Sequence, residues 1–183
     1  DGNARVTARV RAARGWSAPA AATFYVSLPP LVISELMYRP PPSASIFDTN
    51  DPDNFEYVEL QNIGTNILNL IGFRFTNGID FTFTATNGVT NLGPGQFVLI
   101  VKNVNSFVAR YGLRTNIAGA YGGNLNNTGE RLTLVGPRLE PILDFTYSDA
   151  WYPLSDGVGF SLVINDPYGP LDSWGDKDSW RSS

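Results

Sequence analysis

The chain has 183 residues, of which 43% are hydrophobic and 16% charged, and its formal net charge is −4 at pH 7. This hydrophobic share allows a packed core and excludes a wholly disordered chain. The acidic balance argues against nucleic-acid binding, because contacts with phosphate groups need a surplus of Lys and Arg. The absence of Cys and His excludes disulfides and removes the commonest zinc ligand and the usual base of a catalytic triad. No run of about 18 apolar residues occurs, so we expect no membrane insertion.

Residues 1–28 contain two alternating runs that predict a β-hairpin. Residues 5–12 alternate between apolar side chains and Arg or Thr, and the pattern returns at Phe24 and Val26 after a turn region. A lone hairpin is marginal in water. We therefore interpret residues 1–28 as the C-terminal hairpin of a preceding β-sandwich module and residues 29–30 as a linker. The alternative is a polyanion-binding stripe on the polar face, although an outward row of charges is normally a solvated face. That stripe would consist of Arg5, Arg9, Arg11 and Arg14.

The main domain is predicted to span residues 31–166 and to consist of short strands. Two β-rich runs, 31–38 and 55–62, flank a loop rich in Pro and Asp. The prolines after Tyr38 lack backbone donors, so the first strand must end near that residue. Residues 97–101 are continuously apolar, which is typical of a strand buried on both faces.

One short helix is expected at residues 103–111. Asn103 or Asn105 can cap its start, its apolar residues share one face, and Gly112 can end it. Residues 167–183 are predicted to be a polar C-terminal tail. Trp174 and Trp180 are the large apolar side chains available to hold that tail against the domain.

Six segments of the main domain together resemble the lamin-tail domain, an immunoglobulin-like module named for nuclear lamins and frequent in large secreted bacterial proteins. The segments are 32–38, 56–62, 70–75, 92–95, 127–134 and 156–162. The family commonly has Trp where this chain has Phe73, which changes core volume. The resemblance implies an all-β, immunoglobulin-like β-sandwich with one short helix.

The resemblance also implies a non-catalytic function, so we expect no enzyme. The expected role is an adhesion or spacer module of a larger bacterial multidomain protein that is secreted or displayed on the cell surface. Its partners would be other domains of the same protein or surface proteins. The contacts that animal lamin tails make with DNA are not carried over, because the residues are unmatched and the charge has the wrong sign.

A carbohydrate-binding module is the alternative function, with polysaccharide as the partner. Exposed aromatic rings stack on sugars, although most aromatic side chains of a small β domain pack in its core. The candidate residues are Trp16, Trp151, Tyr152, Trp174 and Trp180.

The loop at residues 48–54 offers several oxygen donors, which suit a hard cation such as calcium. The candidate ligands are Asp48, Asn50, Asp51 and Asp53. The EF-hand rule fails, because Pro52 occupies the third ligand position and the defining Gly is missing. The alternative is a turn in which Asp and Asn side chains cap their own backbone. A weaker acidic group follows near the C-terminus and consists of Asp172, Asp176 and Asp178.

Three glutamates lie on the first two predicted strands: Glu35, Glu56 and Glu59. If these strands pair, Glu35 and Glu59 lie side by side, as the two carboxylates of a glycosidase do. The alternative is that each carboxylate is satisfied by a backbone amide, an Arg or water. Replacing Glu35 and Glu59 by Gln would abolish activity only under the enzyme hypothesis.

Overall fold

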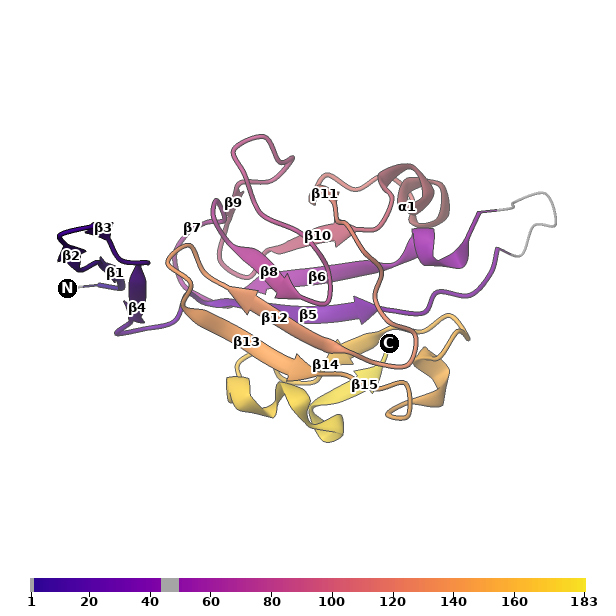
Figure 1. The fold of residues 1–183 in the computed structure, drawn as a ribbon. Helices are drawn as coiled ribbons and strands as arrows, with labels where there is room; N and C mark the ends of the chain where they lie inside the picture. The colour runs from indigo at the N-terminus through magenta and orange to yellow at the C-terminus, as the bar shows by residue number, and fades with distance from the viewer. Residues whose placement is uncertain (1, 44–49) are drawn as a thin grey trace.

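Short β-branched and aromatic runs build two facing sheets in the computed structural model, which describes residues 2–43 and 50–183 (Figure 1). The larger sheet has the strand order β11 (Ile117–Ala120), β10 (Phe97–Val101), β6 (Tyr57–Asn62), β5 (Leu31–Met37), β14 (Leu162–Ile164) and β15 (Trp180–Ser182). The smaller sheet has the order β13 (Pro141–Thr146), β12 (Arg131–Val135) and β8 (Arg74–Asn77). A short pair joins β7 (Leu68–Asn69) to β9 (Asn91–Leu92). The prediction of an all-β sandwich is confirmed.

The two predicted strands β5 and β6 pair antiparallel at the centre of the larger sheet. Ile33 lies opposite Leu60, and Leu36 lies opposite Val58. All four side chains are buried in the core. Alternation puts Val58 and Leu60 on the same side of β6, and a register shift between Ile33 and Glu35 brings Ile33 and Leu36 to the same side of β5. β5 ends at Met37, before the prolines that cannot continue it.

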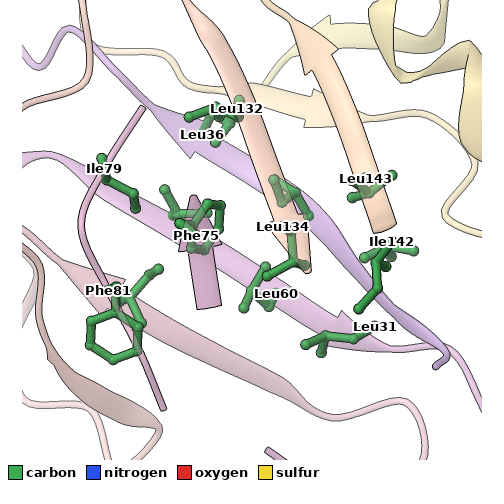
Figure 2. Close-up of a cluster of buried hydrophobic side chains, with 14 of the residues drawn as sticks. Leu31, Leu36, Leu60, Phe75, Ile79, Phe81, Leu132, Leu134, Ile142 and Leu143 are labelled. Atoms are coloured by element: carbon green, nitrogen blue, oxygen red, sulfur yellow. The ribbon is translucent and has the colours of Figure 1, made fainter. Parts of the chain in front are cut away.

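The core lies between the two sheets (Figure 2). The labelled apolar side chains of both sheets point toward one another: Leu31, Leu36 and Leu60 from the larger sheet, and Phe75, Leu132, Leu134, Ile142 and Leu143 from the smaller one. Ile79 and Phe81, from the segment after β8, pack at one side of this cluster. Burial of these side chains supplies the main favourable contribution to folding.

One α-helix, α1 (Val104–Tyr111), occurs in the described part of the chain and packs beside the larger sheet. The side chain of Asn103 accepts a hydrogen bond from a backbone N–H of the first turn, and Gly112 ends the helix with φ of 81°. Phe107 joins Leu99 in a second, smaller hydrophobic cluster. The predicted helix is therefore confirmed together with its start and end.

Residues 167–183, predicted to be a polar tail, contribute to the sandwich itself. β15 pairs antiparallel with β14 and forms an edge of the larger sheet. Trp174 and Trp180 are fully buried. Trp174 lies within the short 3₁₀ turn η3 (Leu171–Gly175), and Trp180 directly follows the turn η4 (Lys177–Ser179). The Trp174 indole donates to the carbonyl oxygen of Ile33 at 3.0 Å, and the Trp180 indole donates to that of Trp174 at 2.8 Å. The segment thus adds one strand and two core side chains to the domain.

The predicted N-terminal hairpin is present. β1 (Ala4–Ala8) pairs with β4 (Ala20–Phe24), and β2 (Arg11–Ala12) pairs with β3 (Gly15–Trp16) nearer the tip. Two hydrogen bonds attach it to the sandwich: the Asn3 amide donates to Glu140 at 3.2 Å, and the Thr23 hydroxyl donates to the Arg138 carbonyl at 2.7 Å. Most of the hairpin is otherwise exposed (Figure 1).

Candidate functional site

Glu35 and Glu59 lie directly opposite each other on β5 and β6, as the sequence suggested. Together they line a pocket of 200 Å³ beside α1, where Tyr57, Phe107 and Tyr111 form part of the wall. The Tyr57 and Tyr111 rings meet edge to face, with centroids 5.6 Å apart. The pocket therefore combines two carboxylates with a packed group of aromatic rings.

Hydroxyl groups donate hydrogen bonds to one oxygen of each carboxylate in this pocket. Tyr57 and Ser161 both donate to Oε1 of Glu35, and Ser34 donates to Oε1 of Glu59 at 2.8 Å. Burial raises the pKa of Glu59; the Ser34 hydrogen bond opposes this shift, and the neighbouring charge of Glu35 adds to it. Burial, followed by the charge of Glu35, also raises the pKa of Tyr57.

The glycosidase hypothesis gains little from this geometry. Small-molecule sites usually enclose roughly 300–1,000 Å³, whereas this pocket encloses 200 Å³. A glycosidase must place a sugar ring and the scissile oxygen between its two carboxyl groups. The hydroxyl partners of Glu35 and Glu59 instead fit a structural role, with Ser and Tyr in place of the backbone amide, Arg or water expected.

Glu56 occupies a different environment, fully buried between η1 and β6. Its Oε2 accepts hydrogen bonds from the Tyr121 hydroxyl at 2.8 Å and the Leu125 backbone N–H at 2.9 Å. Its Oε1 has no partner in the described part of the chain. Burial raises the pKa of Glu56 to about 7, against the lowering effect of the hydrogen bonds from Leu125 and Tyr121. This carboxyl group ties the loop before β12 to β6 and titrates near neutral pH.

The candidate calcium loop is described only in part, because Asp48 lies outside the described residues. Asp51 accepts a hydrogen bond from the backbone N–H of Asp53 at 3.1 Å and caps the short turn η1 (Pro52–Phe55). Asp53 accepts another from the Asn124 amide at 3.1 Å. Within residues 2–43 and 50–183, no three acidic side chains gather where they could hold a metal ion. Calcium binding by Asn50 and its neighbours stays a prediction. The alternative, a turn in which Asp51 caps its own backbone, is present in the structure.

The five aromatic candidates for sugar stacking differ sharply in exposure. The proposal was wrong for Trp174 and Trp180, which are fully buried and so present no ring to a ligand. Trp151 and Tyr152 are half-buried, and the Tyr152 hydroxyl donates to the Trp180 carbonyl oxygen at 2.7 Å. Trp16, near the hairpin tip, is 63% exposed and is therefore the most accessible of the five.

Sequence reasoning missed a groove of 490 Å³ at the start of β10. Its lining includes Asn91, Gln96, Phe97 and Asn116, which come from three segments. Phe97 opens the apolar run that was predicted to be buried on both faces, yet its ring is exposed. The one available signal was the amide-rich sequence that leads into that run. Residues 89–97 of this sequence include no charged residue.

Comparison with protein-family models finds a match to the Lamin Tail Domain over residues 27–148. The matched range covers more than half of the chain and includes β5, β6, α1 and the smaller sheet. No curated protein and no solved structure matched the chain. Within the described residues, no helix combines the length and the apolar character that crossing a membrane requires.

Proposed function

Because the chain belongs to the lamin tail domain family, we propose that it is a non-catalytic interaction module of a larger secreted or surface-displayed bacterial protein. The immunoglobulin-like fold of this family is typically non-catalytic, which supports the first part of the proposal. Adhesion or spacing is the proposed role. The proposed partners are neighbouring domains of the same protein or surface proteins.

The exposed apolar face of the hairpin carries the proposal. The register of β1 and β4 puts six apolar residues on one face: Ala4, Val6, Ala8, Ala20, Ala22 and Phe24. Val6 is 54% exposed and Phe24 is 62% exposed. A two-stranded hairpin needs further packing for independent stability. A preceding β-sandwich module, to which residues 1–28 would belong, supplies the cover that such a face requires.

The attachment of the hairpin to the sandwich supports a spacer role. Glu140 is buried and accepts hydrogen bonds from the Asn3 side chain at 3.2 Å and from the Arg138 backbone N–H at 2.7 Å. The Thr23 hydroxyl adds a bond from β4 to the same turn. A module packed on the hairpin would therefore be held at a defined angle to the sandwich by these contacts, in addition to the short linker expected at residues 29–30.

The test is to replace Val6 or Phe24 by Ser, both in this chain and in the chain extended by its natural preceding sequence. In the chain alone, each change should alter the free energy of unfolding by less than about 0.5 kcal/mol, because both side chains face solvent. In the extended protein, each should cost about 1.5–3 kcal/mol, because the side chain is then buried. Ile67→Ser, at an exposed position on the sandwich, is the control and should be neutral in both. Equally small effects in both proteins would contradict the proposal.

Carbohydrate binding is the second candidate function, and the exposed ring of Trp16 favours it. The Arg11 guanidinium lies over this ring, 5.8 Å from its centroid, and the residue is 63% exposed. Electrophoresis in gels containing cell-wall polysaccharide should retard the chain, and Trp16→Ala should weaken the retardation. Migration that no polysaccharide alters would remove this candidate.

A further inference from the structure

A second surface suits a sugar ligand and does not include Trp16. The groove of 490 Å³ lies between the turn that leads into β10 and the segment that enters β11. Its volume falls within the roughly 300–1,000 Å³ that is usual for small-molecule sites. From its lining we propose that this groove binds a neutral oligosaccharide through Phe97 and the amide side chains around it.

The lining chemistry selects a neutral ligand. None of the described residues that line the groove is charged, in contrast to the pocket of Glu35 and Glu59. A charged ligand would lose water there and find no ion partner, which is unfavourable. Thr115 and the amides of Asn91, Gln96 and Asn116 can each donate and accept hydrogen bonds, as sugar hydroxyl groups can.

Two of these amides are held in place by the backbone. Oε1 of Gln96 accepts a hydrogen bond from the Gly93 N–H at 2.8 Å, and Nδ2 of Asn116 donates to the Phe97 carbonyl oxygen at 3.1 Å. Within the described residues, Nε2 of Gln96 and Oδ1 of Asn116 keep their capacity for a ligand. Side chains fixed before binding lose less conformational freedom when the ligand arrives, so a ligand is bound more tightly.

Phe97 supplies the apolar platform. It begins β10, where its backbone pairs with Gln61 of β6, so the ring rests on a fixed element. The ring is 40% exposed, whereas the rest of β10 is buried. An aromatic ring at the edge of a groove offers a flat face to the C–H side of a pyranose, while the amides orient its hydroxyl groups. Because most of the lining is exposed, internal units of a longer chain can bind as well as its ends.

An NMR titration of the ¹⁵N-labelled chain tests this proposal. The ligands are the uncharged hexasaccharides cellohexaose, laminarihexaose, xylohexaose and chitohexaose, with hexagalacturonic acid as the charged control. At least one uncharged ligand should shift the amide signals of residues 89–97 and 115–116, and the charged control should shift none of them. If no ligand shifts those signals, or if the charged one shifts them most, the proposal is overturned.

Three variants test which side chains contribute to ligand binding. Phe97→Ala should weaken binding at least tenfold, and Phe160→Ala, which removes a ring of the same exposure (39%) elsewhere, should leave it unchanged. Gln96→Glu keeps the acceptor for Gly93 and removes the free donor, so it should weaken binding several-fold even if Phe97→Ala fails to fold. Unchanged affinity in Gln96→Glu and in a folded Phe97→Ala, or signal shifts confined to the surroundings of Trp16, would overturn the groove proposal. Either result leaves the interaction role intact, since that role rests on the hairpin.

Discussion

Replacing Glu56 by Gln should make the protein markedly more stable than the wild type at pH 8, and only slightly more stable at pH 4.5. Glu56 is fully buried, and one carboxylate oxygen has no partner in the described part of the chain. At high pH the folded protein must hold this group as an anion. Gln fills the same volume, can accept the hydrogen bonds of Tyr121 and Leu125, and is neutral at every pH.

The magnitude follows from the difference in pKa between the two states. The pKa of Glu56 rises from 4.5 to about 7 on folding, with burial as the main cause. Because the folded pKa is the higher one, the protonated group favours folding. Its contribution is full below pH 4.5 and is lost as the pH rises through 7. At about 1.4 kcal/mol per pKa unit, the loss amounts to about 3 kcal/mol.

Urea denaturation followed by tryptophan fluorescence at pH 4.5, 6, 7 and 8 measures this contribution. The difference in unfolding free energy between the Glu56→Gln variant and the wild type should increase by about 3 kcal/mol from pH 4.5 to pH 8. Asp172→Asn, which neutralises an exposed carboxylate, is the control for the loss of one negative charge. A flat profile for the Glu56→Gln variant would refute the reasoning.

Three further predictions concern the core, a turn and the carboxylate pair. Trp180→Ala should cost about 3–5 kcal/mol in urea denaturation, because the indole is fully buried; a loss below about 1 kcal/mol would argue against a core role. Gly129→Ala should destabilise the protein by more than about 1 kcal/mol, since φ is 102° and the new Cβ would lie 2.3 Å from a backbone oxygen. Gly95→Ala, with φ of 70° and no atom within 4 Å, should cost clearly less, and equal losses would refute the steric argument. Glu35→Gln should lower the pKa of Glu59, measured by NMR titration of its side chain, because a neighbouring negative charge is removed; an unchanged or higher pKa would contradict the proposed coupling.

Local patterns were sufficient to predict the central strands and the helix. In β6 the alternation of Val58 and Leu60 with polar residues fixes which side faces the core. Asn103 and Gly112 mark the ends of α1 because their roles depend on the backbone within one turn. The pairing of Glu35 with Glu59 followed from the same strands, since antiparallel neighbours put opposite residues side by side.

Features that depend on distant contacts could not be predicted. Trp174 lies in a polar segment, and its burial requires the carbonyl oxygen of Ile33, which is 141 positions away. The exposure of Phe97 depends on where β10 begins relative to neighbouring strands. The apolar run alone carries no information about that position. The burial of the Glu56 carboxylate depends on the loop that brings Leu125 to the start of β6. Sequence periodicity reports which face of an element is apolar, and not which part of the chain covers it.

Hydrogen–deuterium exchange of the β1 and β4 amides tests the interaction role most directly. The measurement compares this chain with the same chain extended by its natural preceding sequence. Fast exchange is expected in the chain alone, where the apolar face is open to solvent. Strongly slowed exchange is expected in the extended protein, with the sandwich amides of β5 and β6 unchanged. Equally fast exchange of the hairpin in both proteins would contradict the claim that a neighbouring module covers this face.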